Sequence, residues 1–215
     1  MQLTTVIVTR NVSISVKTLH TLLKLNIICI QQNIANELVF VRDDAFEKHD
    51  ILMKKLKHCE RILWIDYSIF VDEASLVKLL APFPKGFNVM VAPCVTEGIN
   101  WDLFKKKIRE GSTEPKSQLG LDFDTEVSNK IEEGVHLVTK TNPKVWSADA
   151  KQVIRAFKDK KGESVKIPIK TNEMFEKFRE RGVKVCAFTD ANLIATYPHE
   201  CLGNILETAG VRVGK

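Results

Sequence analysis

Short apolar runs alternate with longer amphipathic stretches along the 215-residue chain, and this alternation limits the folds that it can adopt. Near-continuous apolar runs of four to eight residues are typical of strands buried on both faces. The early stretches between them carry apolar residues at helical spacing, as crossovers between parallel strands require. The sequence therefore predicts an α/β fold, with a mostly parallel central sheet flanked by helices.

The expected elements can be placed by their residues. We expect strands at Thr4–Thr9, Glu37–Val41, Arg61–Asp66, Asn88–Pro93, Val135–Thr139, Val183–Phe188 and Ala191–Thr196. We expect helices at Ser15–Leu25, Phe46–His58, Asp72–Leu80, Asn100–Glu110, Pro143–Gly162 and Thr171–Gly182. The sequence has neither an internal repeat nor a linker, so we predict a single domain over residues 1–215, and we assign Trp64 and Trp146 to its core.

Composition and charge exclude several partners. The net charge of +5 is mild and diffuse, which suits a small anionic substrate and does not indicate nucleic acid. No apolar run is long enough for a membrane span. Cys29, Cys94 and Cys186 lie in apolar runs and no CxxC is present, which favours reduced core cysteines. With no signal-peptide pattern at the N-terminus, the sequence predicts a cytoplasmic protein.

Common catalytic motifs are absent. The C-terminal GVRVGK is one residue too short between its glycines for a phosphate loop, and no GxGxxG follows the first strand. His199 and Glu200 resemble part of a zinc-protease helix, but Gly203 stands where the second histidine is needed. A GxSxG nucleophile elbow is also missing. These absences exclude most easily recognised enzyme classes.

The stretch RILWIDYSIF, residues 61–70, ends an apolar strand on a carboxylate, Asp66, with Ser68 two residues later. Burying a carboxylate is costly unless it is paired or binds a metal. If the extended backbone continues past Asp66, its side chain and that of Ser68 face the same side. Ligands gather at the carboxyl ends of strands in open parallel sheets, and such oxygen donors suit Mg²⁺ or Mn²⁺. The alternative is a solvated strand end that turns into a helix N-cap.

This strand, with an Asp-x-Asp-like end about sixty residues after a first strand, resembles the metal-binding DxD motif of GT-A glycosyltransferases. The resemblance covers nearly the whole chain, in TTVIVTRN, VFVRDD, FEKHDILMKKLKHCERILWID, APCVTEGINWDLF and TNEMFEKFRERGVKVCAFTDANLIATYPHE. More narrowly, the chain looks like the N-terminal glycosyltransferase domain encoded by large chlorella viruses, which glycosylates their major capsid protein. The resemblance implies a GT-A fold with a nucleotide-binding half over about 1–95 and an acceptor-binding half over about 96–215.

The resemblance also implies roles for particular residues. It places the nucleotide near Thr9, Arg10, Asp44 and Lys48. Asp43 competes with Asp44 for the contact with the uridine or ribose. The resemblance places the metal at Asp66, Ser68 and His199. It places the acceptor or sugar at Asn100 and Trp101, and a catalytic carboxylate near the reacting carbon at Glu173, alongside Asp66. Surface arginines, helix first-turn acids and structural histidines are the ordinary alternatives for these positions.

The expected activity is transfer of a hexose or deoxyhexose from a UDP-sugar to a glycan hydroxyl of a glycan or glycoprotein. Mn²⁺ or Mg²⁺ is the expected cofactor, and retention of configuration is slightly favoured because no clear base stands out. Ser68 departs from the family pattern, where the second acid of DxD often binds the metal directly. Two alternatives stay open: a sugar-phosphate nucleotidyltransferase, and a non-catalytic domain that binds a nucleotide sugar or glycan. If the protein is viral, its expected place is the host cytoplasm. The alternative that the chain is one part of a longer multidomain polypeptide stays open.

Overall fold

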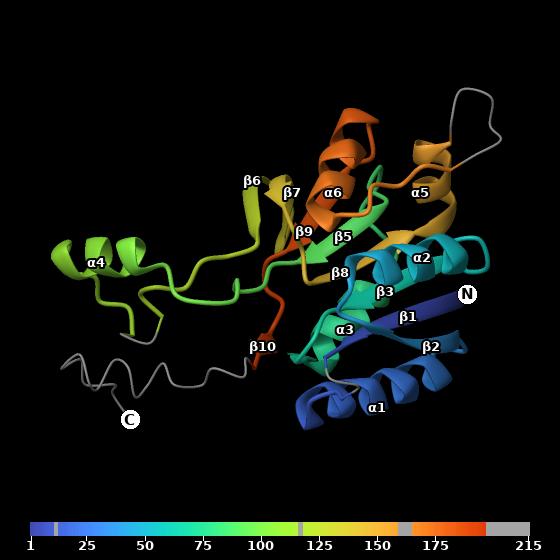
Figure 1. Cartoon of the computed structure of the whole chain (residues 1–215), viewed down its shortest axis with the longest axis horizontal. Coiled ribbons are helices and arrows are strands. Elements are labelled where there is room, and N and C mark those ends of the chain that lie inside the picture. Colours follow the sequence, from blue (N-terminus) through green and yellow to red (C-terminus); the bar gives the residue numbers. More distant parts are fainter. Residues whose placement is uncertain (11–12, 116–117, 159–164, 197–215) are drawn as a thin grey trace.

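The computed structural model describes residues 1–10, 13–115, 118–158 and 165–196, which form two sheets and six helices (Figure 1). The strands are β1 (Gln2–Thr9), β2 (Ala35–Arg42), β3 (Arg61–Ile65), β4 (Ile69–Val71), β5 (Val89–Ala92), β6 (Thr125–Glu132), β7 (Val135–Thr141), β8 (Val145–Asp149), β9 (Val185–Phe188) and β10 (Leu193–Ala195). The helices are α1 (Val16–Gln31), α2 (Ala45–Lys55), α3 (Glu73–Leu80), α4 (Trp101–Arg109), α5 (Ala150–Phe157) and α6 (Thr171–Glu180).

The central sheet has eight strands in the order β2-β1-β3-β8-β5-β9-β7-β6. β2, β1 and β3 are parallel, as are β5 and β9. β8 runs antiparallel to β3 and β5, and β7 runs antiparallel to β9 and β6. Every strand of this sheet except β8 and β7 therefore points the same way. This confirms the predicted α/β class with a mostly parallel central sheet, flanked by helices.

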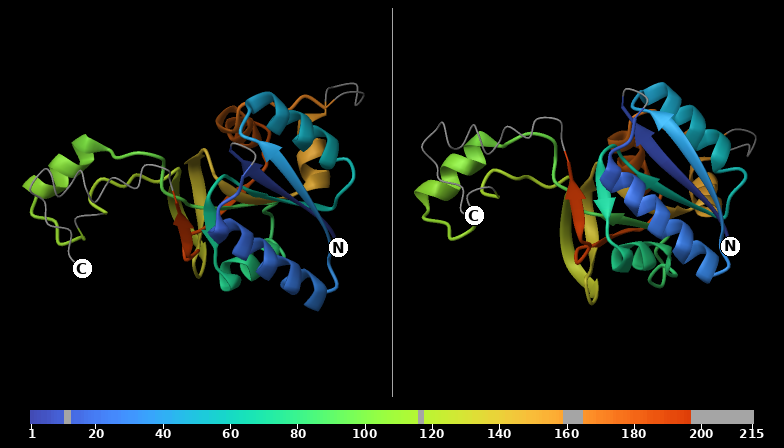
Figure 2. Two further views of the ribbon diagram at one scale, coloured as in Figure 1. Left: turned by 60° about the horizontal axis from the view of Figure 1, so that its bottom comes forward. Right: turned by 90° about the horizontal axis from the view of Figure 1, so that it is seen from below.

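Helices cover both faces of the sheet (Figures 1 and 2). One core cluster packs α2, α5 and α6 against the sheet, and the other packs α1, α3 and β4 against its opposite face. Both clusters are rich in Val, Ile and Leu, the residues that fit strands buried on two sides. This explains why the early strands read as unbroken apolar runs in the sequence.

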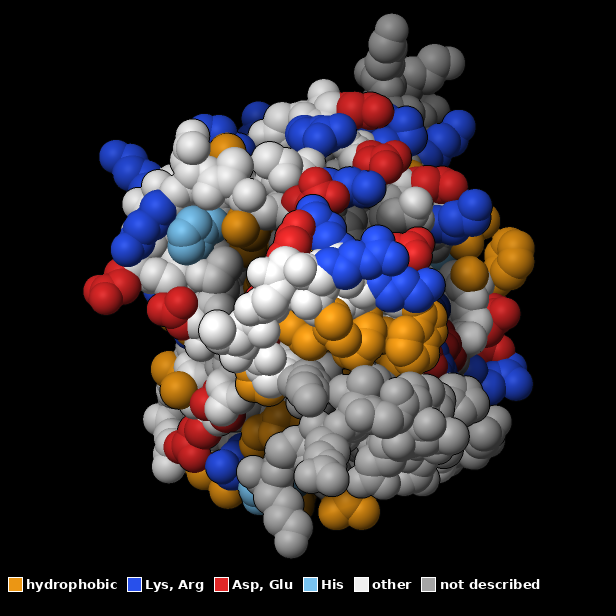
Figure 3. Space-filling model, turned by 90° about the vertical axis from the view of Figure 1, so that its left-hand side faces the viewer, with side chains coloured by type: hydrophobic (Ala, Val, Ile, Leu, Met, Phe, Trp, Pro, Cys, Tyr) orange, Lys and Arg blue, Asp and Glu red, His pale blue; other side chains and the backbone are white. Residues whose placement is uncertain are grey.

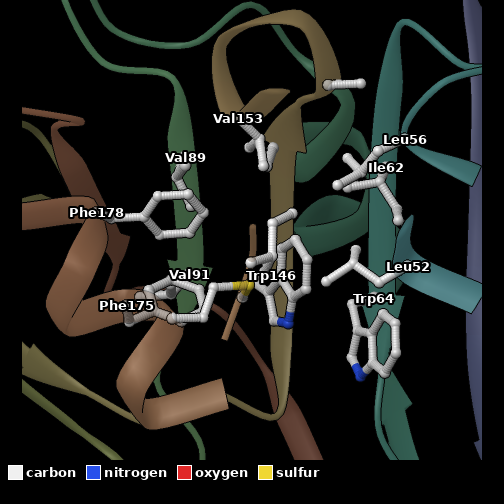
Figure 4. Packing of buried hydrophobic residues seen from close by; sticks show 14 of the residues in the cluster. Leu52, Leu56, Ile62, Trp64, Val89, Val91, Trp146, Val153, Phe175 and Phe178 are labelled. Atoms are coloured by element: carbon white, nitrogen blue, oxygen red, sulfur yellow. The ribbon is translucent and has the colours of Figure 1, made fainter. Parts of the chain in front are cut away.

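Trp64 and Trp146 lie in the core, as predicted (Figure 4). Their rings stack with centroids 5.6 Å apart and planes 9° apart, and Phe175 of α6 meets Trp146 edge-on at 5.8 Å. Such ring pairs add stability beyond the area that they bury. The two tryptophans thus connect β3 and β8 in the middle of the sheet, and Trp146 packs against α6.

The expected helix at Pro143–Gly162 is wrong in its first part. Residues Val145–Asp149 form β8, and the helix α5 begins only at Ala150 and ends at Phe157. β8 pairs with β3 and β5 on its two sides, so tertiary pairing decides the structure of a segment whose local pattern also suits a helix. Asp149 then caps α5 by accepting a hydrogen bond from the Gln152 amide at 2.9 Å.

Besides β8, the strands β6 and β4 were not predicted from the sequence. β6 has little apolar alternation, and β4 is short. β6 carries a mostly exposed, polar set of side chains at the edge of the sheet, where no apolar face is needed. β4 has three residues and pairs with β10 in a separate two-stranded sheet. The predicted Ala191–Thr196 strand corresponds to β10, over Leu193–Ala195.

Residues 95–115 and 118–123 form an arm that projects from the sheet and carries α4 at its tip (Figures 1 and 2). Its two branches are joined by a bridge between Val95 and Phe123 and by the bond from the Asn100 amide to the Gly120 carbonyl at 2.9 Å. Figure 3, which faces this end of the molecule, shows Lys and Arg side chains beside a band of hydrophobic ones. The arm builds its small core from Phe104 and Leu119, which are buried.

Candidate functional site

The carboxyl ends of β1, β2 and β3 lie side by side. Thr9 pairs with Arg42, and Ile7 pairs with Ile65, so the residues that follow these strands share one edge of the sheet. β8 runs the other way and starts at this edge, opposite the ends of β3 and β5. The edge therefore gathers Arg10, Asp43, Asp66, Glu97 and Lys144, which come from five separate parts of the sequence.

Arg10 connects three of these chain segments. Its Nε donates to Asp43 Oδ2 at 2.8 Å, and its two terminal nitrogens donate to the carboxylate of Glu97 at 3.2 and 3.1 Å. The guanidinium also lies 5.0 Å from the ring centre of Tyr67. The hydrogen bonds that Arg10 donates to Glu97 and Asp43 raise the pKa of Arg10, and Glu97 has the larger effect. The bonds between Arg10 and Glu97 also lower the pKa of Glu97. The planar fork of arginine is suited to such bidentate contacts, and equally to phosphate.

Lys48 of α2 reaches the same cluster. Its Nζ donates to Asp43 Oδ1 at 2.6 Å. Burial by itself would raise the pKa of Asp43, but the hydrogen bonds from Lys48 and Arg10 outweigh it and lower that pKa. Asp43 therefore stays ionised and holds two cationic side chains at the strand ends.

Asp66 lies partly buried directly after β3. Its Oδ1 accepts a hydrogen bond from the Tyr67 amide at 2.7 Å, and its own amide donates to the Lys144 carbonyl at 2.9 Å. Burial raises the pKa of this carboxyl, and Asp43 raises it further, whereas the Tyr67 bond and the charges of Lys48 and Lys144 lower it. The site thus holds a carboxylate whose charge the surrounding protein only partly compensates, as in many functional sites.

The expectation that Asp66 and Ser68 extend along one strand is wrong. β3 ends at Ile65, and Ser68 adopts a left-handed backbone with φ of 58° in the turn between β3 and β4. The period-two alternation that would align the two side chains therefore stops at this turn. The Ser68 carbonyl accepts a bond from the Thr196 amide at 2.9 Å, so the last described residue after β10 lies beside Ser68. The predicted ligand His199 lies outside the described residues.

Asp124 is a further member of the site that the sequence did not reveal. Its Oδ1 accepts from the Cys94 amide at 3.1 Å and from the Thr125 hydroxyl at 2.7 Å, while Oδ2 accepts from the Lys144 amide at 3.1 Å. Burial raises the pKa of Asp124. This carboxyl joins the end of β5 to the start of β8, and so positions Lys144 and, through it, the backbone of Asp66.

Two predicted nucleotide contacts are engaged in local structure. The Thr9 hydroxyl donates to the Val41 carbonyl at 3.1 Å, and the Thr9 carbonyl accepts from the Asp43 amide at 2.9 Å. Asp44 is the N-cap of α2, where Oδ1 accepts from the amides of Phe46 and Glu47 at 3.0 and 2.9 Å. Of the two competing acids, Asp43 is therefore the one that joins the cluster.

Glu173 lies in the first turn of α6, where its carboxylate is 3.3 Å from Lys170 Nζ. The start of α6 lies next to α2, because Thr171 and Lys48 line the same small slot, which also exposes part of Trp64 and Trp146. Glu173 is thus near the α2 side of the site, although none of the contacts found in the described chain joins it to Asp66.

Asn100 and Trp101 are on the arm, at the start of α4, shortly after Glu97, which bonds to Arg10 (Figure 1). Asn100 caps α4, with its Oδ1 accepting from the Leu103 amide at 3.0 Å and its Nδ2 donating to Asp122 at 3.3 Å. Trp101 is 41% exposed and meets Phe104 edge-on at 5.8 Å. No hydrogen bond or ring contact within the described ranges joins either of these two residues to Asp66.

The donor set fits a divalent cation only in part. Asp66 offers one carboxylate oxygen besides the one that accepts from Tyr67. Within the ranges that the structure describes, no group of three or more His, Cys, Asp or Glu side chains is arranged to hold a metal. A single carboxylate suits Mg²⁺ or Mn²⁺ when a substrate diphosphate and water complete the coordination. Asp66 is the described residue that would hold such an ion.

Comparisons with known proteins bear on the fold. No protein-family model and no curated protein matches the sequence. The crystal structure of A197 from STIV matches with a TM-score of 0.54 and 13% identity, over 92% of this chain and 86% of that one. At this identity the likeness shows a shared fold alone.

Two further structures are more distant. A 4-diphosphocytidyl-2C-methyl-D-erythritol synthase from Anaerococcus prevotii matches with a TM-score of 0.49 and 12% identity, over 97% of this chain and 96% of that one. A mutant Drosophila β-1,4-galactosyltransferase 7, in complex with manganese, UDP-Gal and xylobiose, matches with a TM-score of 0.47 and 9% identity, over 100% and 75%. These two likenesses are too remote to carry an argument. Separately, none of the helices described here is long and apolar enough to cross a bilayer.

Proposed function

We propose that this chain is a metal-dependent GT-A glycosyltransferase that moves a sugar from a UDP-sugar to a hydroxyl of a glycan or glycoprotein. The observation that carries the proposal is the carboxylate of Asp66, held partly buried at the carboxyl edge of the sheet with its pKa raised by burial. Arg10 and Lys48 lie in the same cluster, bridged by Asp43. Carboxylates and cationic side chains gathered at one edge suit a cation and a diphosphate bound together.

Each group has a role in this proposal. Arg10 and Lys48 bind the diphosphate, in exchange for part of their bonding to Glu97 and Asp43. Asp66 holds Mn²⁺ or Mg²⁺, which when bound would neutralise charge on the departing UDP. Ser68 and His199 are proposed to assist at the metal, the latter three residues beyond Thr196, whose amide already reaches the Ser68 carbonyl. Thr9 and Asp44, or Asp43, are proposed to contact the nucleoside.

The acceptor side of the proposal rests on α6 and the arm. Glu173, in the first turn of α6, is proposed to take or orient the acceptor proton, as a positioned carboxylate can. Asn100 and Trp101 form the proposed acceptor contact. Trp101 has the exposed ring that stacking on a sugar requires. A single GT-A domain over 1–215, a cytoplasmic location and a role in viral capsid glycosylation belong to the same proposal.

A UDP-release assay tests this function. Purified protein would be incubated with a panel of UDP-sugars, beginning with UDP-Gal, and with an oligosaccharide acceptor such as xylobiose, each with and without Mn²⁺. We expect UDP release that requires the metal and the acceptor together. Release of pyrophosphate when UTP and a sugar 1-phosphate are supplied in place of the UDP-sugar would instead identify a nucleotidyltransferase, and saturable UDP-sugar binding without turnover would identify a non-catalytic binding domain.

A further inference from the structure

Trp146 carries a buried hydrogen-bond donor that the site described above does not use. The residue is 2% exposed, and its indole Nε1 finds no hydrogen-bond partner within the described ranges. Leaving a buried N–H unpaired costs free energy, so such a group is rare unless an acceptor arrives from outside the protein. The indole therefore points to a ligand atom that can accept a hydrogen bond.

The indole borders a narrow slot that leads toward the edge of the sheet that carries Asp66. Figure 4 shows the nitrogens of Trp146 and Trp64 at the same end of the stacked rings, on the side toward which β3 runs from Ile62 to Trp64. The slot lies between α2, β3, β8 and residues 168–174, and its cavity of about 20 Å³ has room for one oxygen-sized atom. A larger group would have to remain at the mouth.

The other groups at the slot are also donors or cations. α6 begins at Thr171, and its N-cap residue, Lys170, supplies no side-chain hydrogen bond, so the first-turn amides lack that partner. The positive end of the helix dipole adds to this effect. Lys48 contributes an ammonium group, and no Asp or Glu lines the slot. Its histidine, His49, is already bonded through Nε2 to the Ile167 carbonyl at 2.9 Å.

We propose that this slot receives one oxygen of an anionic group, a phosphate or a carboxylate, whose remaining atoms lie at the mouth beside Lys48. The Trp146 indole and the first-turn amides of α6 donate to that oxygen. This anion site adjoins the Asp66 cluster, because Lys48 lines the slot and also bonds to Asp43, but it differs from the cluster in having no carboxylate in its lining. It deepens the proposed function by requiring a negatively charged group on a substrate, and it rests on that function only for the identity of the substrate.

Thermal unfolding at constant ionic strength tests the proposal without any catalysis. Inorganic phosphate and glucuronate are titrated separately, so that the two arms distinguish a phosphate source from a carboxylate source. Because a ligand that binds only the folded state raises the melting temperature, we expect a saturable rise with at least one of the two anions. No saturable rise with either anion would overturn the proposal, whether or not the protein releases UDP.

Two variants sharpen the test. Trp146→Phe keeps an aromatic ring against Trp64 but removes the N–H, so we expect at least ten-fold weaker anion binding, and the rise in melting temperature is measured relative to the anion-free variant because the smaller ring also lowers its stability. Lys170→Asp supplies a carboxylate cap to α6, which should compete with the anion and weaken its binding at least ten-fold. Lys105→Asp, on α4, makes the same charge change far from the slot and should leave anion binding unchanged. If all three variants bind the anion equally well, the proposal that the slot binds an anion is wrong.

Discussion

The sheet edge at Arg10 and the arm at α4 both display polar and charged residues, but they use them differently. At the sheet edge, Arg10, Asp43 and Lys48 bond across segments that are far apart in the sequence. In the arm, Asn100 bonds to the Leu103 amide and to Asp122, and so closes its own local structure. A site is therefore recognised by charges that the fold brings together and leaves only partly compensated.

The largest expected effect comes from removing the charge at the centre of the edge. Asp66→Asn should lower metal-dependent UDP release at least about 100-fold, since metal stabilisation of the leaving group is worth several kcal/mol. The matched change in the arm, Asp102→Asn, should leave metal-dependent release within about two-fold of the original. Initial rates at saturating Mn²⁺ measure both, and equal rates in the two variants would remove Asp66 from the mechanism.

The next effect concerns the phosphate contacts. Arg10→Ala should weaken UDP binding by about 10- to 100-fold, because bonds between charged groups contribute roughly 1.5–3 kcal/mol each. Its ion pairs with Asp43 and Glu97 are partly exposed, so the same change should cost only about 1 kcal/mol of unfolding free energy. Calorimetric titration with UDP and urea unfolding measure the two quantities. A large loss of stability with unchanged UDP binding would give Arg10 a purely structural role.

The raised pKa of Asp66 gives this residue its own contribution to the pH dependence of stability. The folded protein holds this proton more tightly than the unfolded chain does, so the contribution of Asp66 falls as pH rises from the ordinary Asp pKa of about 4 through the raised value. Asp43 and Glu97, whose pKa values are lowered, contribute with the opposite sign. Asp66→Asn should remove the contribution of Asp66, because the amide does not titrate. Asp124 contributes with the same sign as Asp66 and keeps its own fall in the variant. Urea unfolding between pH 3.5 and 7 measures it, and an unchanged slope would contradict this assignment.

The smallest effect is expected in the arm. Asn100→Ala removes the cap of α4 and should lower the free energy of unfolding by about 1 kcal/mol, without changing UDP binding.

Under the proposed function, Trp101→Ala should raise the acceptor KM several-fold while leaving the UDP-sugar KM unchanged. Steady-state kinetics with both substrates varied separate these cases. Equal changes in the two constants would show that the arm and the edge act as one site.

The sequence predicts the sheet edge better than the rest of the molecule for a physical reason. The strands that precede Arg10, Asp43 and Asp66 each contain a short apolar run, so their ends are visible in the sequence. β8 was hidden because Val145–Asp149 suits either a helix or a strand until β3 and β5 pair with it. With β8 misread, Lys144 and its partner Asp124 could not be placed at the edge.

The details of the site depend on features that periodicity does not carry. The left-handed turn at Ser68 interrupts the alternation of side chains that the sequence suggests, and nothing in the sequence Asp66-Tyr67-Ser68 requires this turn. Asn100 and Trp101 come several residues after β5 and lie at the start of α4, in an arm that projects from the sheet (Figure 1). Strand ends can thus be predicted from local pattern, whereas the path of the chain after them cannot.

Calorimetric titration of UDP, with and without Mn²⁺, into the original protein and into Asp66→Asn tests the central claim most directly. We predict that Mn²⁺ strengthens UDP binding at least ten-fold in the original protein, and that the variant keeps its metal-free affinity but loses this gain. An equal Mn²⁺ effect in both proteins, or no binding of UDP under either condition, would contradict a cation held at Asp66.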